Sequence, residues 1–142
     1  MSDIIIRKAN SNDIDQLFGL VEKFATSYKA NHEAFTISFE NLFNDMSVFL
    51  YVVECNEELI GYCLGFDHYT FFANGRVSWL EEIMILESYR KSGIGRKLMD
   101  EFEKWAKSRN SGLVALATRR AAPFYKALDY EESAVYFRKL LK

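Results

Sequence analysis

The segment from Tyr89 to Leu98, with the sequence Tyr-Arg-Lys-Ser-Gly-Ile-Gly-Arg-Lys-Leu, constrains the fold of this chain more than any other. Its two glycines, Gly93 and Gly95, allow a tight turn and a close approach of a ligand to the backbone. Apolar residues at helical spacing follow, which predicts that a helix begins here, and the first amides of a helix have no partner within it. Four cations and no carboxylate lie in this segment, although the chain has a formal net charge of −2. The segment therefore predicts a strand–loop–helix unit that binds an anion, with phosphate or pyrophosphate as the target.

A glycine-started helix with a solvated basic end would show the same residues without binding an anion. The strand before the loop, the helix after it and the cluster of positive charge together favour the anion site. Two other phosphate-binding motifs are excluded. Leu98 occupies the position of the third glycine of a dinucleotide-binding fingerprint, and the Gly-Lys-Ser/Thr of a P-loop is absent.

Apolar, β-rich stretches in the middle of the chain predict three consecutive strands in an antiparallel meander. These strands are expected at residues 48–53, 59–71 and 76–86. The pair Asn74-Gly75 predicts a two-residue hairpin between the second strand and the third.

The remaining elements flank this meander and define the fold class. A strand at residues 4–8, a helix that Ser11 or Asn12 caps and that continues to Tyr28, and a shorter helix at 39–46 are expected before it. A helix at 93–109, a parallel strand at 113–117, a short helix at 122–128 and a last strand at 133–141 are expected after it. The order predicts an α/β fold with a mixed, mostly antiparallel central sheet and helices on both faces.

Composition narrows the class of protein further. The 142 residues are 49% apolar with one proline, so we expect a single domain over residues 1–142. The slightly negative net charge gives no general attraction to nucleic acid. The two cysteines, Cys55 and Cys63, are too few for a disulfide framework, and metal-ligand spacing is absent, so no metal site is expected. The chain shows no signal peptide and no apolar run of membrane-spanning length, which predicts a cytoplasmic protein without membrane contact.

Two segments resemble the signatures of a known family, the GNAT superfamily of N-acetyltransferases. Residues Arg90–Gly95 fit its Arg/Gln-x-x-Gly-x-Gly/Ala signature in full, and Phe124–Tyr130 is similar to its second signature, an aromatic-Tyr segment that ends in Leu-Gly-Phe or Leu-Gly-Tyr. The expected order of elements also matches the family fold over nearly the whole chain. Asp129 stands where the family usually has glycine, and Thr118 stands where many members have an asparagine near the coenzyme.

The resemblance implies acetyl-CoA as the donor and assigns residues to it. The residues expected at the coenzyme are Ile83, Met84, Ile85, Arg90, Lys91, Ser92, Gly93, Ile94, Gly95, Arg96, Thr118 and Tyr125. The backbone of residues 83–85 would pair with the pantetheine arm like an extra strand, and the amides of residues 91–96 would bind the pyrophosphate. Tyr125 would protonate the leaving thiolate, a role that fits the chemistry because a nearby hydroxyl lowers the barrier to thiolate departure.

An amine acceptor is mostly protonated at neutral pH, since a primary ammonium titrates near pH ~10. Glu81 and Glu82 lie on the strand before the basic loop, and one is expected on each face of the sheet. Glu81 matches the position of a base in some relatives, acting through water, and we take it as the catalytic base with Glu82 next. Both carboxylates could instead be solvated or salt-bridged.

Three readings of function remain open at this stage. The first is an enzyme that acetylates an amine directly, without an acyl-enzyme, since Cys63 has no companion typical of a nucleophile. Its acceptor is a small polyamine-like or aminoglycoside-like molecule or a protein amine, and a homodimer is left open. The second is a non-catalytic acyl-CoA-binding module that senses or regulates, against which the presence of Tyr125 argues. The third, an unrelated phosphate-binding α/β protein, is disfavoured by the second signature.

Overall fold

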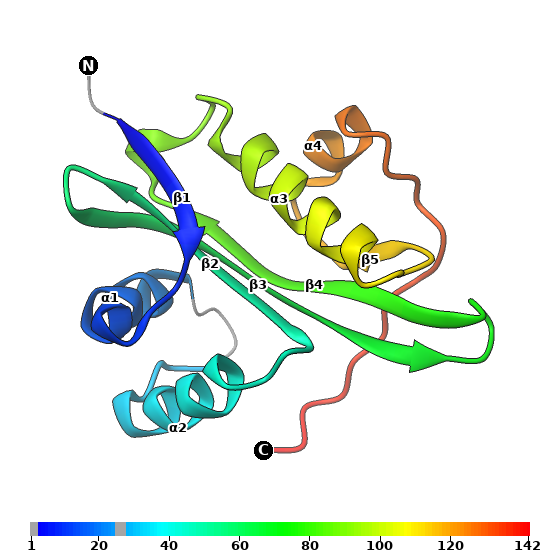
Figure 1. Cartoon of the computed structure of the whole chain (residues 1–142), viewed down its shortest axis with the longest axis horizontal. Helices are drawn as coiled ribbons and strands as arrows, with labels where there is room; N and C mark the ends of the chain where they lie inside the picture. The colour runs from blue at the N-terminus through cyan, green and yellow to red at the C-terminus, as the bar shows by residue number, and fades with distance from the viewer. Residues whose placement is uncertain (1–2, 25–27) are drawn as a thin grey trace.

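The computed structural model describes residues 3–24 and 28–142, which fold around one five-stranded sheet (Figure 1). The strands follow one another across the sheet in chain order, from β1 to β5. The pairs from β1 to β4 are antiparallel, whereas β5 runs parallel to β4. The mixed, mostly antiparallel sheet expected from the sequence is therefore confirmed.

The elements follow one another in an order that agrees with the sequence prediction up to the last helix. Their bounds are β1 Ile4–Lys8, α1 Ile14–Phe24, α2 His32–Phe43, β2 Val48–Cys55, β3 Glu58–Thr70, β4 Gly75–Ile85, α3 Ile94–Ser108, β5 Val114–Leu116 and α4 Ala122–Ala127. Two short 3-10 helices, η1 Ser11–Asp13 and η2 Glu87–Tyr89, precede α1 and the basic loop. Among the described residues, no helix is long and apolar enough to cross a membrane.

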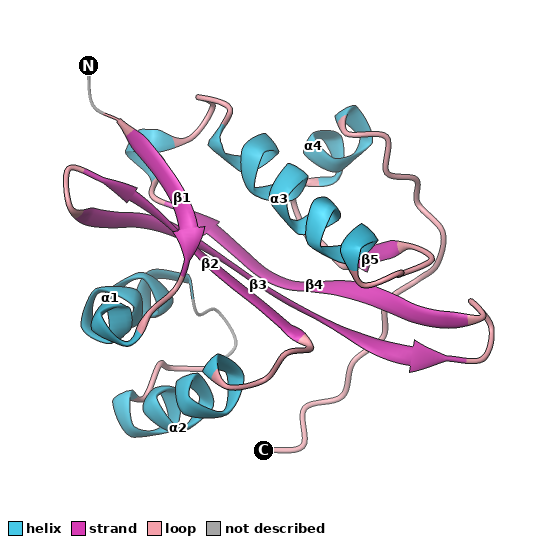
Figure 2. Cartoon of the chain, viewed as in Figure 1, coloured by secondary structure: helices cyan, strands magenta, loops and turns pink. Residues whose placement is uncertain are grey.

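The helices form one layer on each face of the sheet (Figure 2). On one face, α1 and α2 bury Leu17 and Phe39 against the sheet residue Tyr62. On the other face, α3 buries Leu98 and Phe102 in a core that includes residues of β2, β3 and β4. The sheet is thus covered on both sides, which explains why its central strands read as nearly continuous apolar runs.

A β-bulge interrupts the pairing of β3 with β4. Leu64 pairs with Glu82 and Gly65 pairs with Leu80, so Glu81 is the extra residue on β4. The bulge resets the alternation of side chains along the strand. Leu80 packs into the core beneath α3, whereas Glu82 contacts Tyr62 on the α1–α2 face.

The pairing of β4 with β5 covers three residues of each strand. Ser78, Trp79 and Leu80 lie opposite residues 114–116. Beyond Leu80, β4 continues to Ile85 with no strand beside this edge among the described residues. The sheet therefore opens between β4 and β5 immediately at the bulge.

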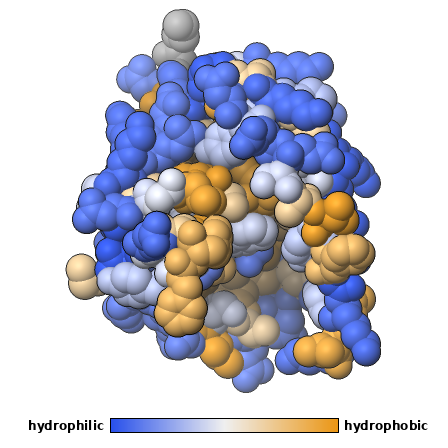
Figure 3. Space-filling model, turned by 90° about the vertical axis from the view of Figure 1, so that its right-hand side faces the viewer, coloured by the Kyte–Doolittle hydropathy of each residue, from blue (hydrophilic) through white to orange (hydrophobic). Residues whose placement is uncertain are grey.

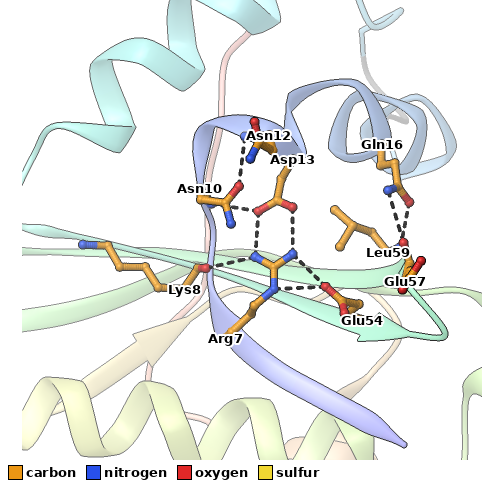
Figure 4. Close-up of polar contacts among 9 residues, drawn as sticks. All are labelled: Arg7, Lys8, Asn10, Asn12, Asp13, Gln16, Glu54, Glu57 and Leu59. Carbon is orange, nitrogen blue, oxygen red and sulfur yellow. Dashed lines mark hydrogen bonds and ion pairs between the residues drawn. The ribbon is translucent and has the colours of Figure 1, made fainter. Parts of the chain in front are cut away.

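An ion-pair network fixes the start of α1 on the sheet (Figure 4). Arg7 of β1 donates hydrogen bonds to both carboxylate oxygens of Asp13, at 2.9 and 2.8 Å, and to Glu54 of β2, at 3.1 and 2.9 Å. Asp13 is buried and also accepts from the backbone N–H of Asn10, and the hydrogen bonds from Arg7 hold its pKa below the usual range. A buried carboxylate is stable only when it is paired, so Asp13 favours the arrangement in which it contacts Arg7. The network therefore ties the start of α1 to β1 and β2.

Four sequence predictions were wrong in detail. Asn10, not Ser11 or Asn12, caps the first helical turn, and α2 begins at His32, seven residues before the expected Phe39. The cap of α2 is Asn31, whose side chain accepts from the Ala34 N–H. The first helix is described as far as Phe24, its predicted positions 25–27 lie outside the described residues, and its predicted last residue, Tyr28, is not helical. The hairpin between β3 and β4 has four residues, 71–74, instead of two, although Asn74 does adopt the left-handed conformation.

The strand expected at residues 133–141 is absent from the described structure. These residues follow α4 as a tail without helix or strand, which begins on the right-hand side of Figure 1, the side that faces the viewer in Figure 3, and pairs with no strand described for this chain. Most of the tail is exposed. The apolar pattern that predicted a strand is therefore present, but this single chain supplies no strand partner for it.

Candidate active site

The basic loop between β4 and α3 has the backbone geometry of an anion site. Gly93 is the residue before the helix, with φ of +88°, and no side chain caps the first turn of α3. Lys91 also adopts the left-handed conformation, with φ of +62°. The first N–H groups of α3 are therefore uncapped at the positive end of a 15-residue helix.

The two signature glycines serve different purposes. A side chain at Gly93 would meet no atom within 4 Å, so the space before the helix is open, and the positive φ strains any other residue there. At Gly95 a Cβ would lie 3.1 Å from the Phe124 ring and 3.6 Å from Ile85. Gly95 thus lets α3 pack closely on α4 and β4, whereas Gly93 leaves room for a ligand.

The opened edge of β4 presents free backbone groups to a ligand. The N–H of Ser78 points to β5, since it donates to Leu113, and the N–H of Leu86 points to β3, since it donates to Ile60. Neighbouring residues of a strand alternate in this direction, so the backbone groups of Ile83 and Ile85 point to the opened edge. Their N–H groups and the Ile83 C=O can pair with an extended ligand as a further strand would, whereas the Ile85 C=O already accepts a hydrogen bond from Arg90.

Arg90 connects this edge to the basic loop. Its guanidinium Nε donates to the Ile85 carbonyl at 2.8 Å. The Ser92 hydroxyl donates to the Tyr89 carbonyl within the same turn. A cavity of about 700 Å³ adjoins the loop, and its lining includes two cations, Lys23 and Arg90, and one carboxylate, Glu87. The hydrogen bond of Arg90 therefore links the opened edge to the loop that precedes the helix terminus.

Tyr125 lies in the core beneath α3, where its ring contacts Phe124 and Tyr130 at centroid distances of 5.0 and 5.8 Å. Burial raises the pKa of Tyr125 to about 12, so its hydroxyl stays protonated at neutral pH. No buried side-chain polar atom of the described residues lacks a hydrogen-bond partner, and the structure gives the Tyr125 hydroxyl none. The hydroxyl therefore reaches accessible space and is free to donate.

The two strand glutamates lie in different surroundings. Glu81 is the bulged residue and is exposed. Glu82 is half-buried on the α1–α2 face, where the Tyr62 hydroxyl donates to its Oε1 at 2.7 Å. Burial raises the pKa of Glu82, and the hydrogen bond from Tyr62 opposes that rise. Tyr62 was not singled out from the sequence, because only the cross-strand register reveals its contact with Glu82.

Two other residues considered from the sequence, Thr118 and Cys63, have surroundings that the fold itself explains. The Thr118 hydroxyl accepts from the Ala121 N–H at 3.0 Å and so caps the turn before α4. Burial raises the pKa of the Cys63 thiol, which keeps it neutral and a poor nucleophile. Two polar side chains outside the sequence-predicted site also have partners: Asp67 is buried and paired with Arg109, and His32 packs edge-on against Phe18. The described residues contain no cluster of side chains able to hold a metal ion.

The profile of the Acetyltransferase (GNAT) family matches residues 15–130. This range includes both signature segments and every strand except β1. The chain therefore belongs to the GNAT family of acetyltransferases. No curated protein sequence matches the chain.

Solved structures share this fold at low sequence identity. A glucosamine-6-phosphate N-acetyltransferase from Arabidopsis thaliana superposes with a TM-score of 0.87 at 17% identity, over 99% of each chain. An aminoglycoside N-acetyltransferase in complex with CoA gives 0.85 at 19% identity, over 98% of this chain and 96% of that one. A transcriptional regulator from Bacillus halodurans gives 0.86 at 21% identity, over 98% and 100%. The shared property is the fold.

The different surroundings of the two glycines generate a prediction. Gly93→Val places a β-branched side chain in the open space before α3 and strains its backbone, so coenzyme A affinity should fall by at least about tenfold. Calorimetric titration with coenzyme A measures this change. Gly112→Val, distant from the loop, is the control for a glycine replacement and should leave the affinity unchanged if the variant folds. Equal affinity of Gly93→Val and the wild-type protein would contradict the anion site.

Proposed function

We propose that this protein is an N-acetyltransferase that transfers the acetyl group of acetyl-CoA directly to an amine. The observation that carries the proposal is the opened edge of β4, which has an uncapped helix terminus at one end and a protonated tyrosine on one face. The contrasting surroundings of Tyr125 and Glu82 on opposite faces of the sheet add support. Membership of the GNAT family supports acetyl transfer. The roles given below to individual residues are part of the proposal.

The residues of the proposed donor site match the parts of an acyl-CoA. The amides of residues 91–96 and the cations Arg90 and Arg96 would hold the pyrophosphate, since a helix N-terminus and guanidinium groups both favour anions. Ile83, Met84 and Ile85 would place the extended arm along the edge of β4. Thr118 keeps a hydroxyl proton to donate because the Ala121 N–H uses only its oxygen.

Acetyl-CoA supplies the acetyl group as a thioester, whose C–S bond breaks as the C–N bond to the amine forms. Tyr125 would donate a hydrogen bond to the departing sulfur. Because its pKa of about 12 exceeds that of an ordinary thiol, near ~8.5, complete proton transfer to the thiolate is unfavourable. We therefore assign Tyr125 the role of a hydrogen-bond donor that stabilises the developing negative charge.

The proton of the attacking ammonium must go to a base, for which the two strand glutamates are the candidates. Glu81, at the bulge, is exposed to water and fits a relay through solvent. Glu82 has a raised pKa and lies beside the opened edge on the α1–α2 face, so it can take the proton from an acceptor bound on that face. We propose Glu82 as the base and retain Glu81 as the competing assignment.

A non-catalytic acyl-CoA-binding module remains the alternative. Such a module needs the basic loop but needs neither a protonated donor at the thioester nor a half-buried carboxylate on the other face. The release of free thiol from acetyl-CoA in the presence of an amine panel separates the two functions. Coenzyme binding without amine-dependent thiol release would favour the module.

Deleting the Tyr125 hydroxyl tests the donor role. Tyr125→Phe keeps the ring contacts with Phe124 and Tyr130 but removes the hydrogen bond to the sulfur, so kcat should fall by roughly 10²-fold. Thiol release with one good amine gives kcat, and calorimetry gives the affinity for coenzyme A, which should change little. Tyr51→Phe is the control for loss of a hydroxyl elsewhere in the same core. An unchanged single-turnover rate in Tyr125→Phe would show that the hydroxyl serves only packing.

The pH dependence distinguishes the two glutamates. Glu82→Gln should lower kcat/KM most near neutral pH, where the amine is charged, and the defect should shrink as pH rises, because free amine then forms without a base. Glu81→Gln should show no such rescue. The measurement is a pH–rate profile for the wild-type protein and both variants with the same amine. Rescue confined to Glu81→Gln would transfer the role of base to Glu81.

A further inference from the structure

A cavity of about 230 Å³ lies between α1, α2 and the sheet, on the same face as Glu82. Its walls are mainly aliphatic and aromatic and come from α1, α2, β2, β3 and β4. They include Leu17, Val21, Phe35, Leu42, Leu50 and Leu64. A preformed apolar cavity with few polar groups is the usual form of a small-molecule site.

The polar groups of this cavity are few and specific. Glu82 is the single carboxylate among its lining residues, and Tyr62 fixes it through the 2.7 Å hydrogen bond. Among the described residues that line the cavity there is no lysine, arginine or histidine, and Asn31 and Ser38 add an amide and a hydroxyl. The cavity therefore offers one site for a cation, no site for a phosphate, and apolar walls for the rest of a ligand.

The bulge places this cavity beside the donor site. Glu82 follows the bulged residue directly, and the next residue, Ile83, turns its backbone to the opened edge. A ligand nitrogen at Glu82 would consequently lie next to the position proposed for the thioester. A polyamine or an aminoglycoside would bring several cations to a cavity with one carboxylate, and a sugar phosphate would bring an anion to a cavity without a cation.

We propose that the acceptor is a primary amine on a compact apolar group, such as an aromatic ring on a short alkyl chain. Its ammonium pairs with Glu82 and its apolar group lies between α1 and α2. The proposal rests on the proposed function. The acceptor class adds to that function by excluding acceptors with several charges.

An acceptor panel tests this proposal through thiol release from acetyl-CoA. The panel contains phenethylamine and tyramine, spermidine, kanamycin, glucosamine 6-phosphate and a lysine-containing peptide. We expect kcat/KM for the arylalkylamines to exceed that for each other acceptor by about 10²-fold. Ala34→Leu, which narrows the cavity, should raise the KM of the best arylalkylamine about tenfold and leave the KM of acetyl-CoA unchanged. Glu33→Leu, the neighbouring position outside the cavity lining, is the control for the added side chain.

The outcomes separate the acceptor class from the function. A preference for spermidine, kanamycin, the amino sugar or the peptide would overturn the acceptor class and leave the N-acetyltransferase standing. An Ala34→Leu variant with an unchanged KM for the arylalkylamine would also overturn it. Coenzyme A binding with no amine-dependent thiol release would overturn the proposed function itself.

Discussion

The extra residue on β4 is the constraint on which the site depends. With Glu81 bulged out of the β3–β4 ladder, the strand turns Leu80 to the α3 face and Glu82 to the α1–α2 face. The pairing with β5 ends at Leu80, so the edge opens at the same place. A bulge bends and twists its strand locally, and here that single irregularity provides both an opened edge and a carboxylate beside it.

The two helical layers give the two faces of the opening different chemistry. On the α3 face, close packing of Gly95 against Phe124 places the helix terminus and Tyr125 near the same edge. On the α1–α2 face, the Arg7–Asp13–Glu54 network holds the start of α1 to two strands, and the cavity that Glu82 faces lies beneath α1 and α2. Under the proposed function, a donor and an acceptor on opposite faces would meet where the sheet is open, in the gap between β4 and β5.

Local signals predicted most elements because their causes are local. The glycine pair and the amphipathic stripe predicted α3 within one residue at each end, with Gly93 and Arg109 as its flanking caps. The start of α2 was missed because the capping residue Asn31 precedes a stretch of weak periodicity. The facing of Glu81 and Glu82 could not be predicted either, since strict alternation assigns their faces and a bulge reverses that assignment beyond it.

The sequence by itself determined the class of protein, because the basic glycine loop and the aromatic-Tyr segment are each contiguous in sequence and can be recognised without the fold. It also determined that residues 133–141 have the pattern of a strand. Only the tertiary structure decided that Glu82 contacts Tyr62, that the Phe124 ring packs closely on Gly95, and that the tail has no strand partner among the described residues of its own chain. Each of these facts depends on residues distant in sequence that the register of the sheet and the packing of the helices bring together, and no local pattern encodes that register.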